Sequence, residues 1–492
     1  MTVIGECLDR FGHLASKHVT YPLWLAREGE SRVLRYMREF EEVLSWPRLR
    51  IEDLQTRRLR AIVRHAYETT PYYRDRFDRA GVKVEMIKDP TDLRLIPRLT
   101  KEDLRHHAHD LMSRHYSLGS LFRSATGGST ATPIRFYQDT DSVLRRVAHT
   151  HVFNRWYGLD LGEKMALLWG AAQDLTAIDS IKDRVKERYI FRRMILPCAR
   201  LDEGMLDLYV RRLREFRPTL LRGYTNSLFA LAQYILATKS EVPLEAVVSA
   251  AEPLYPFQRP VIEEAFGAPL FEQYGSREAG LMASECQAHG PLHVDAASIC
   301  LEIVDRGGKA GKDDRIATSD AGASREGEIL VTDLFNYGMP LLRYAIGDLG
   351  RWDGDGCGCG AGLPALAQVS GRVTDSILTP DGTLVSGAAL TVYLVADRPG
   401  FKQLQVVQER LEGVTVRIVP SESYTESDME YLRRQLRRFL GTSMKIDYRF
   451  ESEIPKEASG KYRYVVSSLW SSRAESPGAA DQGDAATQGG EK

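Results

Sequence analysis

The stretch SATGGSTATPIRF, residues 124–136, sets a run of small and hydroxylated residues before a proline and a short apolar segment. Such a run cannot build a core, because it offers hydroxyls and bare backbone N–H groups instead of large apolar side chains. Successive N–H groups of this kind form a concavity that binds anions such as phosphate. Two interpretations stay open for the stretch alone: a loop that wraps phosphate oxygens, or a solvent-exposed turn.

The charge balance argues against two classes of partner. Of the 492 residues, 66 are Lys or Arg and 67 are Asp or Glu, which leaves a net charge of −1 and no whole-chain field for nucleic acid or an anionic membrane. The beginning of the chain lacks a signal-peptide pattern. The apolar stretch MALLWGAA (165–172) is shorter than the roughly 20 residues that a membrane helix needs. We therefore expect a cytoplasmic protein with neither nucleic acid nor membrane as a partner.

The organisation along the chain predicts a large α/β domain. Single cores stop growing at roughly 250–300 residues, so a chain of this length favours more than one domain. Apolar residues recur at helical spacing before about residue 85, and residues 140–270 alternate helix with strand candidates such as KMALLWG and PTLLRGY. Short strand candidates follow over residues 299–350. We expect a large domain over 1–372, with a sheet flanked by helices, a helical N-terminal segment and a β-rich subdomain.

A smaller unit is predicted to follow. FKQLQVVQER, GVTVRIVP and MKIDYRF have the composition of strands, and SESYTESDMEYLRRQLRRFLG has the pattern of a helix that Thr425 or Ser427 caps and Gly441 ends. We expect a small α+β domain over residues 373–472. Residues 473–492 are small and polar and cannot offset their chain entropy by burial, so we expect them to be disordered.

Two further motifs offer polar groups suited to a nucleotide. In QYGSREAG (273–280), the aromatic ring of Tyr274 can lie against a purine, and Glu278 can face phosphates only if Mg²⁺ bridges the two negative charges. The alternative is a surface turn with an incidental glutamate. In PLLRYAIGDLG (340–350), Asp348 can accept hydrogen bonds from ribose hydroxyls, and the alternative is a turn aspartate that satisfies its own backbone.

Two more motifs lie near the smaller unit. SGRVTDSI (370–377) carries Arg372 at the junction of the two expected domains, where it is either a hinge or an ordinary linker. IPKEASGKYR (454–463) carries Lys461 past a glycine-containing bend. An ammonium group there can reach a phosphate as a point charge, and the alternative is an exposed basic loop.

Taken in order, these motifs resemble those of the adenylate-forming (AMP-binding) superfamily. Within it the chain is most similar to the branch of phenylacetate–CoA ligases, CapK-like capsule-biosynthesis proteins and coenzyme F390 synthetases. LRAIVRHAYETTPYYRDRF, SAAEPLYP (249–256) and the run through Cys286, His293 and Glu302 carry that similarity, which spans residues 50–470. The resemblance implies the adenylate-forming fold, with a large nucleotide-binding domain and a small mobile C-terminal domain.

The resemblance also implies a phosphate site and a metal site. The phosphates of ATP are expected against the loop formed by Thr126, Gly127, Gly128, Ser129 and Thr130. Ala131 and Thr132 stand where the family usually has glycine and lysine, which makes this loop stiffer and less positive. Glu278 is expected to hold Mg²⁺. Arg277 stands before it where the family usually has a hydroxyl residue, which puts that contact to the α-phosphate in doubt.

The remaining residues implied by the family surround the adenosine and the moving domain. The adenine site is expected to lie between one group formed by Ala251, Glu252 and Pro253 and another formed by Tyr274, Gly275 and Ser276. Asp348 corresponds to the ribose ligand and Arg372 to a catalytic arginine beside the nucleotide. Thr374 stands at the pivot position, and Lys461 corresponds to the lysine that drives adenylation.

The implied reaction has two halves. A carboxylate attacks the α-phosphate of ATP to give an acyl adenylate and pyrophosphate, and CoA then takes the acyl group after the small domain rotates. We expect an aryl or arylacetic acid as substrate. Tyr224 and Gly170 are candidates to line its pocket, although Tyr224 can equally pack in the core.

Three points stay open at this stage. The acceptor can instead be an amine, a hydroxyl, a carrier protein in trans or a deazaflavin. A non-catalytic nucleotide-binding protein is the alternative from another class. The oligomeric state is undetermined, and a dimer through the N-terminal helices is one possibility.

The cysteines suggest a second metal. CQAHGPLHV (286–294) and GCGCG (356–360) offer cysteines and histidines on two turns, the usual form of a structural zinc site, and the family resemblance implies Cys286, His293, Cys357 and Cys359 as the four ligands. His289 competes for the histidine position. The alternative is two unrelated glycine-rich turns with free thiols. Cys7, Cys198 and Cys300 are expected to be packing residues.

Overall fold

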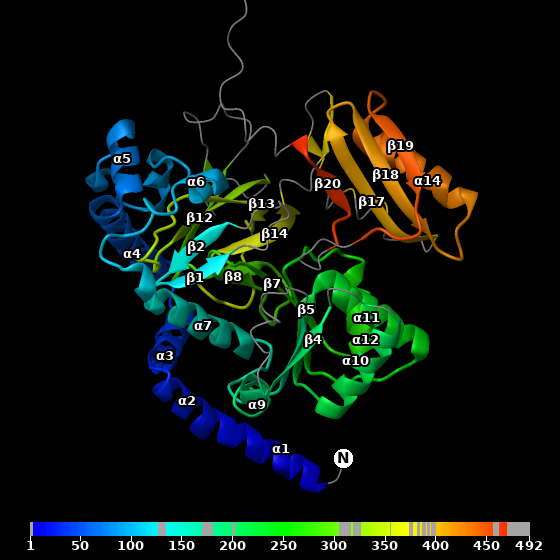
Figure 1. The fold of residues 1–492 in the computed structure, drawn as a ribbon, viewed down its shortest axis with the longest axis horizontal. Coiled ribbons are helices and arrows are strands. Elements are labelled where there is room, and N and C mark those ends of the chain that lie inside the picture. The colour runs from blue at the N-terminus through cyan, green and yellow to red at the C-terminus, as the bar shows by residue number, and fades with distance from the viewer. Residues whose placement is uncertain are drawn as a thin grey trace, which may run out of the picture. The chain divides into compact units, whose positions relative to one another are not determined.

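The computed structural model (Figure 1) divides into two compact units. The first contains residues 1–371 and 455–462, and the second contains residues 372–454 and 463–492. The residues that the structure describes are 3–125, 134–169, 181–198, 201, 203–304, 316–317, 326–354, 356–372, 377–380, 384–385, 390, 394, 400–455 and 462–469. The expected disordered tail, 473–492, lies outside them.

A mixed β-sheet is the frame of the first unit. Among the described residues it has 12 strands. In the order of the sheet these are β11 (Ile316–Ala317), β10 (Ile299–Val304), β12 (Gly327–Asp333), β13 (Tyr344–Trp352), β14 (Ala365–Arg372), β9 (Leu292–Val294), β8 (Gly280–Ser284), β7 (Leu270–Ser276), β6 (Ala246–Ala250), β5 (Leu220–Tyr224), β3 (Met165–Trp169) and β4 (Arg193–Pro197). The expected α/β class is confirmed.

One half of this sheet is parallel. β4, β3, β5, β6 and β7 all run in the same direction. Every residue of β6 is buried, as expected for a parallel strand that helices cover on both faces. On one face, Leu221 and Val247 share a core with the helices α10 (Glu203–Phe216), α11 (Thr225–Thr238) and α12 (Gln258–Phe266), which gather beside β4 and β5 in Figure 1. The strands predicted from KMALLWG and PTLLRGY are confirmed.

The other half of the sheet is antiparallel. β7 and β8 form a hairpin, and β8 pairs with β9, which pairs with β14. β10, β12 and β13 are antiparallel neighbours, so the predicted β-rich subdomain is confirmed as the second half of one continuous sheet. A side chain at Gly275 would put its Cβ 2.7 Å from the carbonyl oxygen of Gly280, so the hairpin requires glycine there.

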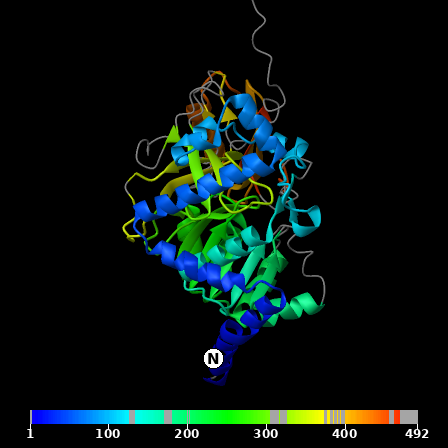
Figure 2. The ribbon, with the colours of Figure 1, turned by 90° about the vertical axis from the view of Figure 1, so that its left-hand side faces the viewer.

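Helices form the N-terminal segment, which Figure 2 shows in blue against the sheet. They are α1 (Val3–Ala15), a π-helix (Ser16–Thr20), α2 (Tyr21–Arg27), α3 (Arg32–Leu44), α4 (Arg48–Thr69) and α5 (Pro71–Ala80). α4 and α5 are separate because Pro71 begins a new helix, as the sequence predicts. A buried ion pair supports this packing, since Arg343 binds Glu302 at 3.1 Å and also donates to the carbonyl of Ile96 at 2.8 Å.

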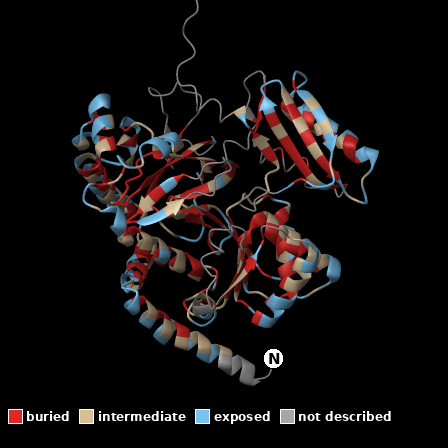
Figure 3. Cartoon of the chain, viewed as in Figure 1, coloured by how far each residue is buried: buried red, intermediate tan, exposed pale blue. Residues whose placement is uncertain are grey.

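The second unit is a small α+β structure. Its sheet has the order β19 (Lys445–Phe450), β18 (Gly413–Pro420), β17 (Phe401–Arg410), β20 (Val465–Ser467). Burial alternates along β18 (Figure 3), because one face packs on the helix α14 (Glu426–Leu440). The side chain of Asp428 accepts hydrogen bonds from both the N–H and the hydroxyl of Thr425, which settles the start of that helix at Thr425. Gly441 ends it with a positive φ of 77°.

Among the helices of the described residues, none combines the length and the apolar character that a bilayer span requires.

Candidate active site

The proposed phosphate loop connects two paired strands. β1 (Phe122–Ala125) and β2 (Arg135–Gln138) are antiparallel, with Ala125 opposite Arg135. The five loop residues Thr126, Gly127, Gly128, Ser129 and Thr130 lie outside the described residues, as do Ala131 and Thr132. The described flanks therefore give the loop a fixed start and end at the tip of a β-hairpin.

The expected adenine and ribose residues lie in contact. The hydroxyl of Tyr274 on β7 donates a 2.9 Å hydrogen bond to Oδ2 of Asp348 on β13. The positive φ of 87° at Gly347 lets the strand turn just before this carboxylate. A Cβ at Gly347 would lie 2.9 Å from Nζ of Lys101, so Lys101 closely approaches the Gly-Asp turn. The sequence analysis missed Lys101, because it belongs to α6 (Lys101–His106), far away in the chain.

Glu278 lies in the turn of the β7–β8 hairpin, where it is 6% exposed. The hydroxyl of Ser276 accepts a hydrogen bond from the N–H of Ala279 at 3.1 Å and so braces the turn. The hydroxyl of Tyr344 donates to Oε1 of Glu278 at 3.0 Å. Tyr344 and Asp348 belong to the same strand, so β13 carries one of the two carboxylates and holds the other, Glu278, through a hydrogen bond.

Arg146 is a second residue that sequence reasoning missed. It lies on α7 (Thr140–Arg155) and donates to the carbonyl oxygen of Glu278 at 2.7 Å and to the buried carboxylate of Asp333. Its side chain also occupies the space that a Cβ at Gly280 would need, with contacts of 3.0 to 3.5 Å. No local pattern marks this arginine, because its partners are more than 130 residues away in the chain.

The Ala-Glu-Pro turn after β6 has an unusual backbone. Ala251 has a positive φ of 67°, a conformation that costs a non-glycine residue about 1–2 kcal/mol. The turn brings Glu252 to the start of α11, where its Oε2 accepts the N–H of Asn226 at 2.8 Å. Its other oxygen accepts the N–H of Tyr462 at 3.3 Å. The described partners of Glu252 are thus a helix N-terminus and the residue that follows Lys461 in the chain.

The other predicted residues divide into two groups. Tyr224 is buried in the core on the side of α10, α11 and α12, with its ring 4.7 Å from that of Trp169. Arg372 is the last residue of β14, and Pro253 directly follows the Ala251–Glu252 turn. Gly170, Thr374 and Lys461 lie outside the described residues.

The four predicted zinc ligands lie together. Cys286 follows β8, His293 belongs to β9, and Cys357 and Cys359 precede β14. Because β8, β9 and β14 are neighbours in the sheet, their connecting turns meet at one edge. One ligand atom from each of the four residues lies within 4.8 Å of all the others.

The distances within this cluster suit a tetrahedral metal. The sulfurs of Cys286 and Cys357 are 3.5 Å apart, and Sγ of Cys359 is 3.3 Å from Nε2 of His293. Zinc–sulfur bonds of about 2.3 Å in a tetrahedron place two sulfurs about 3.8 Å apart. Backbone N–H groups of Ala288 and Ala361 point at Cys286 and Cys359, each at 3.4 Å. Burial raises the pKa of the Cys286 thiol to about 12, and a bound cation would oppose that effect.

The structure separates the two competing histidines. His289 has a positive φ of 50°, its ring stacks on Phe271 at 4.6 Å, and its Nδ1 faces Glu285 at 3.6 Å. His293 instead lies in the cluster with the edge of the Trp156 ring against it. His293 is therefore the histidine that can serve as a ligand in this arrangement.

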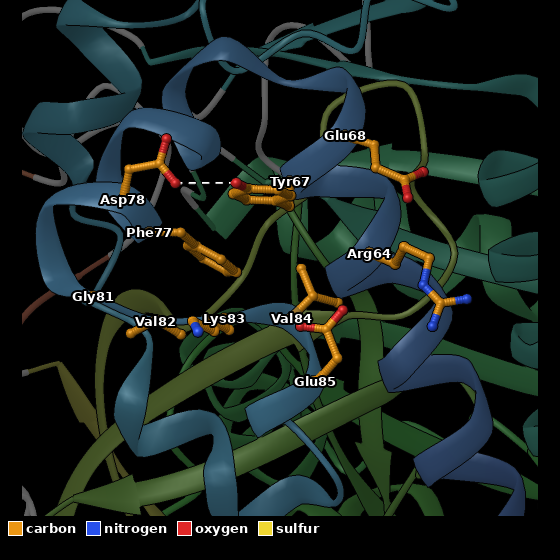
Figure 4. Close-up of a pocket in the computed structure, with 10 residues that line it drawn as sticks. All are labelled: Arg64, Tyr67, Glu68, Phe77, Asp78, Gly81, Val82, Lys83, Val84 and Glu85. Carbon is orange, nitrogen blue, oxygen red and sulfur yellow. Dashed lines mark hydrogen bonds between the residues drawn. The ribbon is translucent and has the colours of Figure 1, made fainter.

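A surface cavity of about 540 Å³ lies elsewhere, among α4, α5 and the 3₁₀ turn Val84–Met86 (Figure 4). Its lining includes Tyr67, whose hydroxyl donates to Asp78 at 3.0 Å, together with the charged residues Arg64 and Lys83. None of the predicted site residues lines it. This cavity is therefore separate from the cluster of Tyr274, Asp348 and Glu278.

Comparison with known proteins finds relatives that align with most of the chain. A family model described as the CapK C-terminal domain matches residues 377–468. Protein CapK of Staphylococcus aureus is 23% identical over 454 residues, which cover 88% of this chain and 94% of that protein. Phenylacetate-coenzyme A ligase of Thermus thermophilus is 24% identical over 471 residues, which cover 86% and 98% of the two chains. Over most of its length the chain is thus similar to CapK and to the phenylacetate–CoA ligases.

A solved structure shares this adenylate-forming fold. The crystal structure of 2-hydroxyisobutyryl-CoA ligase in the postadenylation state, in complex with R3-HIB-AMP, aligns with a TM-score of 0.69 and 21% identity. The alignment covers 88% of this chain and 93% of that one. The predicted fold is thereby confirmed over most of the sequence.

Proposed function

We propose that this chain activates a small carboxylic acid with ATP, as an acyl adenylate, and then transfers the acyl group to CoA. The observation that carries the proposal is the convergence of Tyr274, Asp348 and Glu278. Two motifs that are separate in the sequence supply a base-stacking ring, a carboxylate and a ribose acceptor. Tyr274 bonds Asp348, and Glu278 accepts from Tyr344 on the same strand as Asp348. The relatives named phenylacetate-coenzyme A ligase support CoA as the acceptor.

We infer a role around the nucleotide for each of these residues. The ring of Tyr274 faces the base, and the hydrogen bond from its hydroxyl orients the Asp348 carboxylate for the ribose hydroxyls. Glu278 would hold Mg²⁺, which neutralises phosphate charge. Oε1 of Glu278 already accepts from Tyr344, and among the described residues it has no cationic partner that would compete with a metal. Arg146 holds the backbone of this turn from α7.

The substrate and the compartment follow as further parts of the proposal. The names of the relatives favour an aromatic acid, and the cytoplasm stays the predicted location because ATP and CoA are available there. We assign the delivery of Lys461 to movement of the segment that matches the CapK C-terminal model, residues 377–468, of which residues 455–462 group with the first unit in this structure. A dimer through the N-terminal helices stays a prediction.

The Cys/His cluster is proposed to hold a structural zinc ion. Its donor set of three sulfurs and one nitrogen is typical of closed, four-coordinate zinc, and a single ion would join the three cysteines to His293 on β9. The cluster shares no residue with the nucleotide cluster, so its role is to fix the turns beside β8, β9 and β14. It performs no step of the reaction.

Adenylation with a different acceptor is a second candidate. It is favoured by the match of the small unit to the CapK model, because this unit presents the acceptor in the proposed second half-reaction. An amine, a hydroxyl, a carrier protein or a deazaflavin would then replace CoA. A non-catalytic nucleotide-binding protein would bind ATP and release no pyrophosphate.

Pyrophosphate release against a panel of aromatic and aliphatic acids tests the proposal. We expect release that depends on ATP and one class of acid, and an acyl-CoA product when CoA is present. Acid-dependent exchange of pyrophosphate into ATP without acyl transfer to CoA would favour the second candidate. ATP binding with no release for any acid would contradict adenylation.

Lys461→Ala separates the two half-reactions. We expect it to abolish acid-dependent exchange of pyrophosphate into ATP, because the ammonium group neutralises charge that develops at the α-phosphate. Transfer to CoA from a supplied acyl adenylate should persist, since the lysine has left by then. Equal loss of both half-reactions would count against a rotating small domain.

A further inference from the structure

Arg222 on β5 differs in its pairing from four arginines of the first unit that have acidic partners. Arg193 binds Glu187 through two hydrogen bonds of 2.7 and 2.8 Å. Arg146, Arg259 and Arg343 likewise reach Asp333, Glu285 and Glu302. For Arg222, no carboxylate lies within ion-pair distance in the part of the chain that the structure describes. Its guanidinium donates to the side-chain oxygen of Asn154, and its Nε is closed off from solvent with no partner.

Polar groups surround Arg222, and Arg193, which acts on it electrostatically, is a second cation. The hydroxyl of Tyr157 accepts from Gln273 at 3.1 Å, and Nε2 of His151 bonds the Tyr21 hydroxyl at 2.9 Å. Burial lowers the pKa of His151 to about 4 and that of Arg222 to about 10, so at neutral pH the histidine is uncharged and the arginine keeps its charge. A positive charge withdrawn from water without a counter-ion is costly, which indicates that an anion completes this site.

The position of Arg222 relates it to the proposed reaction. It is the central residue of β5, two residues before the carboxyl end of the strand, and ligands of open α/β sheets bind beyond that end. Its partner Asn154 is on α7, as is Arg146, which holds the Glu278 turn. Arg146, Thr150 and Asn154 are spaced by four residues and share one face of that helix, and the Thr150 hydroxyl donates to the Arg146 carbonyl.

Helix α7 also gives the approximate distance between Arg146 and Asn154. Eight residues separate Arg146 from Asn154, and at about 1.5 Å per residue they span about 12 Å. A small acid whose carboxylate reacts near Glu278 would therefore reach Arg222 with its far end. Arg222 has intermediate exposure, whereas Leu221 and Gly223 beside it are buried.

We propose that Arg222 binds an anionic group at the far end of the acid that is activated, so that the substrate is a dianion whose second charge lies about 12 Å from the reacting carboxylate along α7. This rests on the proposed function and narrows its substrate class. Arg222 is then a specificity-determining residue, with Asn154 holding its guanidinium in place. No covalent step involves it.

The test compares paired acids. Each pair is a straight-chain monocarboxylate and the dicarboxylate of equal length, and the series extends to chains whose two carboxylates are about 12 Å apart. We expect kcat/KM for pyrophosphate release to favour one dianion over its neutral-ended partner by at least about 100-fold, since an unmet buried charge discriminates strongly. Arg222→Gln should bring that ratio to about 3-fold or less, with a higher KM as the main change.

Two further variants make the result decisive. Arg193→Gln removes a neighbouring arginine that has its own carboxylate partner, and should keep the full preference. Arg222→Lys keeps the charge and should retain an intermediate preference for the dianion. This variant provides the test if Arg222→Gln does not fold. A structural role alone would lower the melting temperature of the Arg222 variants and leave the ratio unchanged, and that result would overturn the proposal.

Binding separates this proposal from the proposed function. Calorimetric titration of the dicarboxylate series into wild-type protein needs no turnover. Binding that Arg222→Gln abolishes would support the anion site even if no acid released pyrophosphate. Equal binding to both proteins, no binding of any dianion, or a wild-type preference for neutral-ended acids would refute it.

Discussion

The nucleotide cluster and the Cys/His cluster are built in opposite ways. In the nucleotide cluster, Tyr274 bonds Asp348 and Tyr344 bonds Glu278, so each carboxylate already has a partner on the sheet. In the Cys/His cluster, the four donors face mainly one another. A site whose polar groups are paired can lose one member and stay folded, whereas a site that needs an ion depends on it for stability. We therefore expect function to be lost at the first cluster and stability at the second.

The largest expected effect is on stability at the Cys/His cluster. His293→Ala should remove bound zinc and cost about 2–5 kcal/mol of unfolding free energy, the range typical of losing a cross-link that closes a long loop. Cys286 and Cys357 are 71 residues apart, so the ion would close such a loop. Metal analysis and chemical denaturation measure both quantities.

His289→Ala is the matched control for that prediction. His289 is 37% exposed and lies outside the cluster, so zinc content and stability should stay near those of wild type. Zinc lost from His289→Ala and kept by His293→Ala would reverse the assignment. Purified protein without stoichiometric zinc would contradict the proposal that the Cys/His cluster holds this ion.

The next largest effect is on activity at the nucleotide cluster. Glu278→Gln keeps the hydrogen-bond acceptor for Tyr344 and removes the charge, so it should lower kcat for adenylation about 10²–10³-fold, the range for losing one preorganised electrostatic group. The melting temperature should change little. Steady-state pyrophosphate release measures the first effect and thermal unfolding the second.

Glu68→Gln is the control for Glu278→Gln. Glu68 lines the cavity of Figure 4 and is exposed, so the activity of the Glu68→Gln variant should equal that of wild type. Normal activity in Glu278→Gln, or a large loss in Glu68→Gln, would place the reacting phosphates away from the β7–β8 turn.

Tyr344→Phe should give a smaller loss of activity. It removes the 3.0 Å hydrogen bond to Glu278 and leaves the ring in the core, so the expected cost is about 1–1.5 kcal/mol, or about a tenfold fall in kcat/KM. Tyr448→Phe, in the small unit, serves as the control. A change as large as that of Glu278→Gln would mean that the tyrosine itself contacts a substrate.

Glu252→Gln should give the smallest effect. The glutamine still accepts from Asn226, but it loses the interaction of a charge with the N-terminus of α11, which is worth about 0.3–1 kcal/mol. Thermal unfolding should show this small loss, with KM for ATP unchanged. A large rise in KM for ATP would show instead that Glu252 contacts the nucleotide, as the family resemblance implies.

The sequence was sufficient for the fold and for the residues that lie within motifs. Tyr274, Asp348 and Glu278 each stand in a short pattern of aromatic, glycine and carboxylate, and the order of the patterns indicated the fold that the structural comparison confirms. Arg146 and Lys101 could not be found in this way. Each is an ordinary helical residue by composition, and only the packing of a distant element brings it to the site.

The choice between His289 and His293 also could not be made from the sequence. His289 and His293 are equally plausible by spacing, because a tight turn can bring either one to a cysteine. The deciding feature is the pairing of β9 with β14, which sets His293 opposite Ala365, close to the Cys-x-Cys loop. Register between strands distant in sequence is not encoded in a local pattern, so the sequence left both histidines open.

The most direct test of the central claim is a crystal structure with a non-hydrolysable analogue of the acyl adenylate. The account predicts the base against Tyr274, the ribose hydroxyls on Asp348 and the phosphate beside the Glu278 turn. A nucleotide bound in the cavity among α4 and α5, or anywhere else away from these three residues, would contradict it.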